Sequence, residues 1–477
     1  MNDNSFFFYD LETSGVNEAR DRIMQFAGQR TNLELEPIGE PINVLVKLSD
    51  DILPSPMAVK ITGITPQMTQ HEGLTEPEFL QLLDREVFTP GTILTGYNSV
   101  RFDNLFLRYT RYRNFYDPYE WSWKDGRSYW DLLDVTRLIR ALRPERIIWP
   151  FRPDGGVINT LEELAKANGL KQPKAHDALS DVTALIDLAK LLRDRQPRTF
   201  QYLLTMRTKS NVGKFIDEVG SEPFVYTSGS YPIVQLHTTA VSVIGKKRDG
   251  NGVFVYDLRH NPNAYADISD DKLKDSRFAT RAMREAPDYL PFPAKILTFN
   301  KCPAIAPLSV FSSDPSTHEQ LQLTPERIET NLRKLTDSGL GERLSEILGA
   351  EREFPVATDA ENALYEGFFD DTDRIEMQRV RQAKSADFLD MKPTFRDERL
   401  NELFMNYKAR NHPDALSDAE VRAWEEYRAR RFNADVLEFA AELERLAADA
   451  TPVELNLFTD LRLWAESIMP LAMGEDN

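Results

Sequence analysis

The sequence predicts an α/β domain, then a β-rich block, then a helical C-terminal part. From residue 1 to about 196, strand-like runs such as FFFYDL, PINVLVKL and GTILTGYN alternate with helix-like stretches. From about 200 to 320, three further strand-like runs appear, and the turn residues Asp249-Gly250-Asn251-Gly252 join the last two as a hairpin. After Thr324 the sequence is dominated by helix-start patterns.

Each part of this prediction depends on local patterns. The β-rich block rests on FVYTSG, VQLHTTAVSVIG and GVFVYDLR. The helical part rests on Thr324-Pro325, an N-cap followed by a first-turn proline, and on capping boxes at Ser417 to Glu420 and Thr451 to Glu454. Because 477 residues are too many for one hydrophobic core, we expect three domains. Their expected bounds are 1–196, 197–352 and 353–477.

Composition narrows the class of protein. With 41% hydrophobic residues and no apolar run near the roughly 20 residues of a membrane span, we expect a soluble globular protein. The chain enters a strand-like run without the basic flank of a secretory signal, and its one cysteine, Cys302, cannot form an internal disulfide, so we expect a cytoplasmic location.

A net charge of −18 argues against a protein that coats nucleic acid over its whole surface. Any polyanion site must be a local basic groove.

Two acidic residues follow the aromatic run of the first predicted strand. Period-two alternation places Phe8, Asp10 and Glu12 on one face, with the two carboxylates roughly 7 Å apart. Two like charges at the end of a buried strand need a cationic partner, either Lys or Arg side chains or a metal ion. Taken alone, the pair could also mark an exposed strand end.

Two more acidic residues extend this pattern. Asp103 follows the strand-like run GTILTGYN and precedes an apolar helix-like stretch. Asp181 lies on the core-facing stripe of a predicted helix. Three leucines share that stripe: Leu185, Leu188 and Leu192. His176 lies five residues before Asp181, about 140° around a helix, so the two side chains converge only if His176 lies in the preceding loop or first turn.

The acids and the histidine together indicate a chemistry that none indicates alone. Read by itself, His176 is more often a surface or capping residue. Four carboxylates on three elements of one α/β domain supply oxygen ligands for hard divalent cations, and a histidine supplies a base for water. This combination is what two-metal phosphodiester hydrolysis requires.

Three short motifs resemble a known enzyme class. D-L-E-T in the first strand, N-x-x-x-F-D and H-D-A-x-x-D are similar to the DEDDh branch of the 3′→5′ exonucleases, which have an RNase H-like fold. The resemblance implies that Asp10, Glu12, Asp103 and Asp181 bind metal and that His176 is the catalytic base. A sister branch carries tyrosine in place of the histidine.

Longer stretches resemble the bacterial exonuclease I family, single-stranded DNA-specific 3′→5′ exodeoxyribonucleases, along essentially the full length. These stretches are AVKITGITPQ, GYNSVRFD, RNFYDPYEWSW, WDLLDVTRLIRALRPE, YEGFFDDTD and LFMNYKARNHP. The resemblance implies a nuclease domain, an SH3-like β domain and an all-helical C-terminal domain. One departure is Ser14, where the family usually has an aromatic residue, and this puts an aromatic contact near the scissile nucleotide in doubt.

The family pattern also implies a mechanism. Asp10 would bridge two Mg²⁺ ions, which Mn²⁺ could replace, while Glu12 and Asp181 complete the inner site and Asp103 holds the outer ion. Neutral His176 would take a proton from the attacking water. The products would be nucleoside 5′-monophosphates, released processively, in DNA repair and recombination.

Single-strand binding requires basic groups for phosphates and aromatic faces for bases. Residues 108–123, RYTRYRNFYDPYEWSW, alternate basic and aromatic side chains and could form one wall of a DNA-binding groove. A core segment whose polar ends reach solvent would explain the same pattern equally well. The expected substrate contacts are Thr13, Asn98, Arg101, Arg108, Arg113 and Tyr116. Lys246-Lys247-Arg248 and Lys408-Ala409-Arg410-Asn411 are weaker candidates, because basic clusters are usually solvated surface.

A protein partner is implied by the same resemblance. Arg143 and Tyr202 align with a pocket that binds the C-terminal tail of the single-stranded DNA-binding protein. An arginine suits the terminal carboxylate of such a tail, and an apolar rim suits its side chains. We expect no membrane partner and a monomer.

Other functions fit the sequence less well. Another DEDDh exonuclease, acting on RNA or in proofreading, would share the acids, because these do not discriminate at the 2′ position. Such chains are mostly shorter than this one. A noncatalytic replication adaptor would have lost metal ligands, and a paired-carboxylate glycosidase would not need the third and fourth acids or the histidine.

Overall fold

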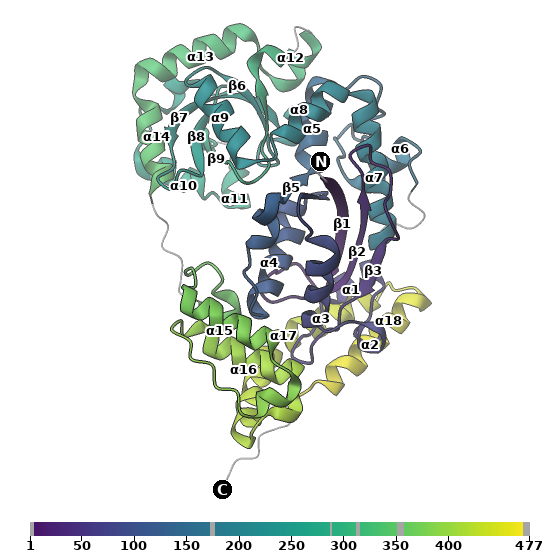
Figure 1. Cartoon of the computed structure of the whole chain (residues 1–477). Coiled ribbons are helices and arrows are strands. Elements are labelled where there is room, and N and C mark those ends of the chain that lie inside the picture. Colours follow the sequence, from purple (N-terminus) through teal and green to yellow (C-terminus); the bar gives the residue numbers. More distant parts are fainter. Residues whose placement is uncertain (1–3, 172–176, 287–288, 312–314, 351–356, 471–477) are drawn as a thin grey trace. The chain divides into compact units, whose positions relative to one another are not determined.

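The computed structural model describes residues 4–171, 177–286, 289–311, 315–350 and 357–470 (Figure 1). The chain divides into two compact units. The first contains residues 1–128, 172–183 and 355–477, and the second contains residues 129–171 and 184–354. Among the described residues, no helix has both the length and the apolar composition to cross a membrane.

A twisted sheet lies at the centre of the first unit. Its strands are β1 (Ser5–Thr13), β2 (Ile23–Thr31), β3 (Ile42–Leu45) and β4 (Thr92–Gly96), in the order β3-β2-β1-β4. β5 (Ser128–Asp131) follows β4 in the sheet, where the chain passes into the second unit. β1 pairs antiparallel with β2 and parallel with β4. The aromatic run of β1 is at most 2% exposed, which confirms that it is a core strand.

Helices of the first unit come from both ends of the chain. Those of the N-terminal part are α1 (Pro56–Thr62), α2 (Pro66–Glu72), α3 (Glu76–Leu82) and α4 (Asp103–Arg113). Those of the C-terminal part are α15 (Asp371–Gln382), α16 (Arg399–Asn411), α17 (Asp418–Ala447) and α18 (Pro452–Ser467). Both predicted capping boxes are present, at the starts of α17 and α18.

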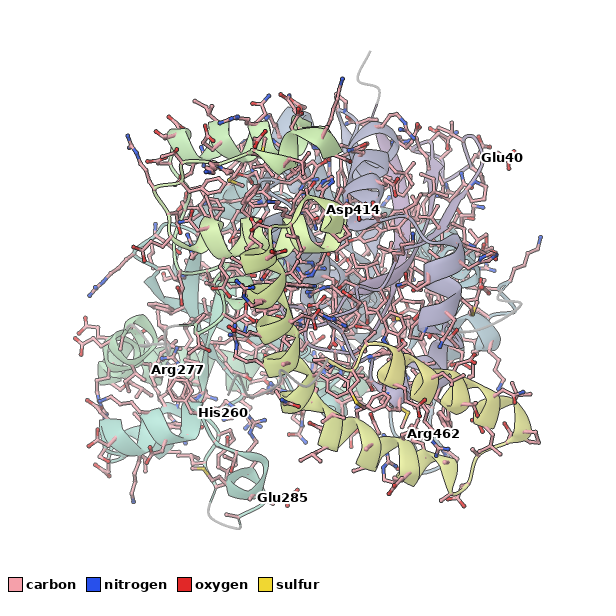
Figure 2. The ribbon with its side chains drawn as sticks, turned by 90° about the horizontal axis from the view of Figure 1, so that it is seen from below. Glu40, His260, Arg277, Glu285, Asp414 and Arg462 are labelled. Atoms are coloured by element: carbon pink, nitrogen blue, oxygen red, sulfur yellow. The ribbon has the colours of Figure 1, made fainter. Side chains whose placement is uncertain are left out.

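The C-terminal helices share hydrophobic cores with the N-terminal part. α1 contacts both α17 and α18. Met24 on β2 packs in one cluster with Phe432 of α17 and Trp464 of α18. Tyr112 of α4 packs in another cluster with Phe388. Charged side chains such as Glu40, Asp414 and Arg462 are exposed on the surface (Figure 2).

The second unit contains a five-stranded antiparallel sheet of order β10-β6-β7-β8-β9. Its strands are β6 (Phe224–Thr227), β7 (Thr238–Lys246), β8 (Gly252–Asp257), β9 (Ala294–Thr298) and β10 (Ala304–Pro307). The predicted hairpin turn lies between β7 and β8, and Gly250 in it has φ +64°, which glycine adopts without strain.

Several helices accompany this sheet. They are α5 (Leu132–Leu142), α6 (Leu161–Ala167), α8 (Pro197–Thr205), α9 (Lys209–Val219), α10 (Asp270–Arg277), α11 (Arg281–Arg284), α12 (Pro315–Leu321), α13 (Pro325–Ser338) and α14 (Leu340–Gly349). α7 (Ala178–Arg195) begins in the first unit and ends in the second. The helix-start patterns after Thr324 are confirmed by α13 and α14, which both belong to the second unit, and α14 contacts β7.

Candidate active site

Three carboxylates converge at the end of β1. Asp10 and Glu12 come from the strand itself, and Asp181 comes from the first turn of α7. Each offers one carboxylate oxygen, and these three oxygens lie within 4.8 Å of one another. The shared face of Asp10 and Glu12 follows from strand alternation, as predicted. Oxygen donors at this spacing fit a hard divalent cation such as Mg²⁺.

The electrostatics of the group also favour a cation. Burial raises the pKa of Asp10 well above its usual value, and Asp103, Glu12 and Asp181 raise it further. Burial, followed by the charges of Asp181 and Asp103, raises the pKa of Glu12 to about 8. Two carboxylates whose pKa values are raised this far lack sufficient positive charge around them. A bound divalent ion would offset their repulsion.

Asp103 and Asp181 each occupy the start of a helix. Asp103 is the first residue of α4 and is 4% exposed. Before α7, the Asp177 carboxylate accepts a hydrogen bond from the Ser180 amide at 3.1 Å and fixes the first turn. The predicted leucine stripe of α7 is confirmed, since its three members are at most 1% exposed. His176, the predicted base, lies outside the described residues.

The turn after Glu12 is closed by Ser14. This side chain is fully buried, and its Oγ accepts a hydrogen bond from the Arg22 amide at 2.9 Å. The Ser14 amide donates to the Arg22 carbonyl at 2.8 Å, and the Ser14 carbonyl accepts from the Ser55 amide at 2.7 Å. The Thr13 hydroxyl donates to the Gly15 carbonyl. Ser14 therefore has a structural place inside the turn and offers no surface to a nucleotide.

A pocket of about 600 Å³ contains Glu12. One side is formed by the turn after β1, including Val16, and another by Met57 and Ile61 of α1. Phe102 also lines it. The remaining wall comes from α17, whose lining residues are Arg431, Asp435, Glu438, Phe439 and Glu442. A helix far along the chain thus forms part of the pocket that holds a candidate metal ligand.

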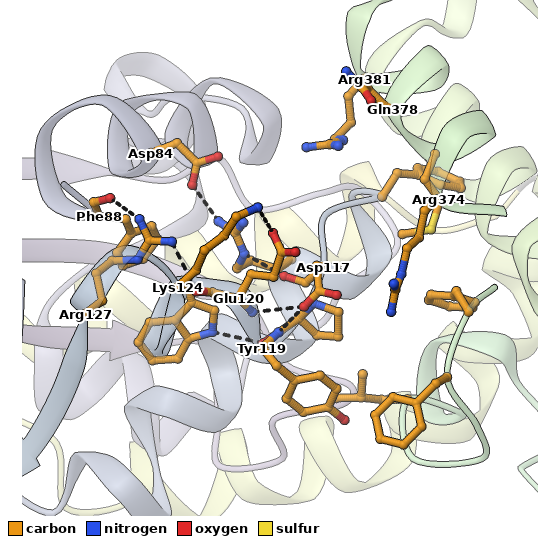
Figure 3. A pocket seen from close by; sticks show the side chains of 18 of the residues that line it. Asp84, Phe88, Asp117, Tyr119, Glu120, Lys124, Arg127, Arg374, Gln378 and Arg381 are labelled. Atoms are coloured by element: carbon orange, nitrogen blue, oxygen red, sulfur yellow. Dashed lines mark hydrogen bonds and ion pairs between the residues drawn. The ribbon is translucent and has the colours of Figure 1, made fainter. Parts of the chain in front are cut away.

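A second pocket, of about 490 Å³, is both basic and aromatic (Figure 3). Arg374 and Arg381 extend into it from α15, opposite Tyr119 and Glu120. The rings of Tyr119 and Phe368 have centroids 6.2 Å apart, and Phe368 is 84% exposed. Residues 108–123, predicted from the sequence as a DNA-binding wall, form one side of this pocket. The side formed by the C-terminal part was not predicted.

Other basic groups of this pocket are held by acids or carbonyls. Arg111 forms a 2.7 Å ion pair with Asp84, and Lys124 forms one of 2.9 Å with Glu120. The Arg127 guanidinium donates to the Phe88 carbonyl at 2.7 Å. These contacts fix the N-terminal wall of the pocket, so its shape does not depend on a bound ligand.

Two predicted contacts to the DNA strand, Arg113 and Tyr116, are buried and present no exposed surface in this structure. Arg113 is 3% exposed and forms an ion pair of 2.6 Å with Glu76. Tyr116 is 6% exposed, with its ring between the guanidinium groups of Arg111 at 4.8 Å and Arg381 at 4.5 Å. Helix and turn geometry directs these two side chains into the protein.

The basic cluster predicted in the tail is also buried. Lys408 is 3% exposed and pairs with Glu420 at 2.9 Å. Arg410 pairs with Asp51 at 2.7 Å and also with Glu361. Both are therefore structural groups and not exposed contacts. In the other predicted cluster, Lys246 is exposed and lies 3.4 Å from Asp217.

Thr13 is buried, 7% exposed, whereas the predicted contacts Asn98, Arg101 and Arg108 lie closer to solvent. Arg101 is exposed at the end of a short 3-10 helix, Ser99–Arg101. Asn98 precedes this helix with φ +64°, a left-handed conformation that asparagine adopts more readily than most residues. The Arg108 guanidinium lies over the Tyr119 ring at 5.6 Å. It therefore supports one ring of the pocket shown in Figure 3.

The predicted partner residues belong to the second unit. Arg143 follows the C-terminus of α5, and its guanidinium donates to the Leu142 carbonyl at 2.5 Å. Tyr202 is on α8, which contacts α5. Its buried hydroxyl has no hydrogen-bond partner among the described residues, and burial raises the pKa of Tyr202 to about 12.

Family comparison covers nearly the whole chain. A model for exonucleases matches residues 7–189, the exonuclease I SH3-like domain matches 207–349, and the exonuclease I C-terminal domain matches 358–468. Exodeoxyribonuclease I of Haemophilus influenzae is 38% identical over 448 residues, which are 94% of each protein.

Solved structures show the same similarity. Escherichia coli exonuclease I in complex with a dA16 oligonucleotide is 37% identical with a TM-score of 0.92, covering 98% of this chain and 100% of that one. A zinc-bound form of the E. coli complex with single-stranded DNA is 36% identical with a TM-score of 0.91, covering 98% and 99%. The chain therefore belongs to the exonuclease I family of exodeoxyribonucleases, with nuclease, SH3-like and C-terminal domains in that order.

Proposed function

We propose that this protein degrades single-stranded DNA from the 3′ end and releases nucleoside 5′-monophosphates. The observation that carries the proposal is the convergence of Asp10, Glu12 and Asp181 carboxylates at the end of β1, with Glu12 lining a 600 Å³ pocket. The similarity to a protein solved with dA16 supports single-stranded DNA as the substrate.

The carboxylates would hold two divalent ions, with Mg²⁺ as the proposed metal and Mn²⁺ as its replacement. Asp10, Glu12 and Asp181 would form the inner site, and Asp103 the outer one. When bound, such ions neutralise charge on the phosphodiester and make a water molecule more acidic. Asp10 and Glu12 must lose their protons to bind them. His176 would accept the proton of the attacking water, a role that rests on its place in the sequence motif.

The pocket beside Glu12 would receive the terminal nucleotide. Met57, Ile61 and Phe102 give it an apolar lining against which a base can pack. Val16, which is 82% exposed, lies in the same turn as the buried Ser14. These side chains would supply the apolar contact that Ser14 does not provide.

The pocket of Figure 3 would hold the strand farther from its 3′ end. Tyr119 and Phe368 present ring faces for bases, and Arg374 and Arg381 present positive charge for phosphates. Each base stack contributes roughly 1–3 kcal/mol. Four further side chains remain proposed contacts to the DNA strand, close to the metal centre or to the Tyr119 ring: Thr13, Asn98, Arg101 and Arg108.

The proposal extends to partners and setting. Arg143 and Tyr202 would bind the C-terminal tail of the single-stranded DNA-binding protein, through the arginine and the apolar surface around it. We propose a cytoplasmic monomer that acts in DNA repair and recombination. Its domains would be residues 1–196, 197–352 and 353–477.

One assay tests this function directly. The purified protein is incubated with 5′-labelled single- and double-stranded DNA and with RNA, with Mg²⁺ or with EDTA. We expect a ladder that shortens from the 3′ end on single-stranded DNA only, and only with Mg²⁺. An Asp10→Asn variant prepared in parallel should give no ladder. Equal activity with EDTA, or shortening from the 5′ end, would contradict the proposal.

A further inference from the structure

A buried charged cluster lies behind the turn that follows Glu12. We call it the arginine cluster, and its side chains are at most 14% exposed. Its members are Arg22, Arg113, Arg410, Arg431, Asp51, Glu76 and Glu361. Four arginines therefore share three carboxylates. Every carboxylate in this cluster is needed to balance buried positive charge.

Glu361 accepts hydrogen bonds from three of the four arginines. It accepts hydrogen bonds from Arg22 at 2.6 Å, from Arg431 at 3.2 Å and from Arg410. Arg22 lies directly before β2, Arg431 lies on α17 and Arg410 lies on α16. Glu361 lies in a 3-10 helix, Ala360–Asn362, of the C-terminal part. The Glu361 side chain is 1% exposed. Removing its charge would leave the buried Asp51 carboxylate, which lies within 3.9 Å of all three guanidinium groups, to balance most of their charge.

Arg22 connects this cluster to the metal-binding strand. Its amide and carbonyl form two hydrogen bonds with Ser14, which is two residues beyond Glu12. The β1–β2 register shifts between Glu12 and Thr13, so the regular ladder is interrupted at the metal ligand. The two hydrogen bonds between Ser14 and Arg22 hold β1 and β2 together just beyond that register shift. The position of Arg22 therefore determines where the end of β1 lies.

A second contact ties the same turn to α17. The Arg20 carbonyl accepts a hydrogen bond from Arg431 at 3.1 Å and another from Arg22 at 2.9 Å. The Arg20 guanidinium forms two 2.8 Å hydrogen bonds with Asp435. The segment between β1 and β2 is thus held by the C-terminal part through both its backbone and its side chains.

We propose that Glu361 is a positioning residue for the metal centre. Through Arg22 and Ser14 it fixes the end of β1, and so it sets the Glu12 carboxylate at the distance from Asp181 that a divalent ion requires. The C-terminal domain thereby completes the metal site without contributing a ligand. The inference rests on the proposed function only in that Glu12 binds the metal.

The test compares metal affinity with stability in DNA-free protein. Glu361→Gln keeps the side-chain shape and removes the charge. Mn²⁺ binding is measured by titration calorimetry and the unfolding temperature by circular dichroism. We expect Mn²⁺ affinity to fall about tenfold or more, the range typical for residues that orient metal ligands. Ser14→Ala removes the Oγ that accepts from the Arg22 amide and donates to Asp21 at 3.4 Å, leaves the arginine cluster intact, and should also lower Mn²⁺ affinity.

Glu420→Gln is the matched control. It removes the partner of buried Lys408, in the same C-terminal helices but with no contact to Arg22. It should lower the unfolding temperature and leave Mn²⁺ affinity unchanged. Unchanged Mn²⁺ affinity in both Glu361→Gln and Ser14→Ala would overturn the inference, as would equal losses in all three variants. If the unaltered protein failed to bind Mn²⁺, the proposed metal centre would also be wrong. This measurement therefore distinguishes a failure of the positioning role from a failure of the proposed function.

Discussion

Glu12 at the end of β1 and Asp181 in the first turn of α7 present carboxylate oxygens within 4.8 Å of each other. After burial, Asp181 is the strongest influence on the pKa of Glu12. Two carboxylates this close are unfavourable without a cation. The arrangement therefore couples metal binding to protonation and to stability.

Stability of the metal-free protein should depend on pH in a defined direction. Because the pKa of Glu12 is raised to about 8, the folded state binds more protons than the unfolded state between about pH 4.5 and 8. This carboxyl therefore destabilises the folded protein progressively as pH rises through that window. With EDTA replaced by Mg²⁺, the unfolding temperature should rise more at pH 8.5 than at pH 6. An equal or smaller rise at pH 8.5 would contradict the assignment of Glu12.

Loss of one metal ligand should nearly abolish turnover. Asp181→Asn removes a charge that helps hold the ions, and metal ions contribute several kcal/mol to such reactions, so we expect a loss of at least about 10³-fold. Asp187→Asn, on the same helix but paired with Lys190, is the matched control and should retain activity. Similar rates for the two variants would show that Asp181 has no special role.

The histidine should affect catalysis and not metal binding. His176→Ala is expected to reduce turnover on single-stranded DNA by about 10²–10⁴-fold, the usual contribution of a general base. Mn²⁺ affinity, measured by calorimetry, should remain close to that of the unaltered protein. Near-normal turnover at neutral pH would exclude His176 as the base.

The pocket of Figure 3 should contribute to strand affinity. In an Asp10→Asn background that cannot cleave, Phe368→Ala should weaken binding of a long oligonucleotide by about 1–3 kcal/mol, because one base stack is lost. Arg381→Gln should weaken binding and also reduce its salt dependence. Phe151→Ala, at a phenylalanine of the second unit that is also exposed (59%), is the control. Fluorescence anisotropy would report all three, and equal losses for Phe151 and Phe368 would argue against a specific track.

Partner binding should depend on one arginine. Arg143→Glu is expected to abolish binding of an acidic tail peptide with a free carboxyl end and to spare activity on bare DNA. Arg146→Glu makes the same charge change at a neighbouring exposed position and should have little effect. If Arg143→Glu reduced activity on bare DNA as strongly as peptide binding, Arg143 would instead hold the fold or the substrate.

The sequence by itself determined the local elements and the candidate metal ligands. The aromatic run of β1, the leucine stripe of α7 and the capping boxes of α17 and α18 depend on residues within a few positions of one another, and each is present as predicted. Asp10 and Glu12 share a face for the same reason. Asp103 was found by its place after a strand-like run and His176 by its spacing to Asp181, and the motif resemblance then gave each its expected role.

The tertiary structure decided which basic side chains reach solvent. Arg113 and Arg410 lie in segments with the residue types of a nucleic-acid surface, yet both are buried against carboxylates that are distant in sequence, Glu76 and Glu361. Only the packed domains bring these partners within reach. The α15 wall of the aromatic pocket and the link from Glu361 to β1 likewise join segments separated by most of the chain. Sequence periodicity predicts which side chains share a face of one helix or strand. Whether those side chains are buried or form ion pairs depends on the element that packs against that face.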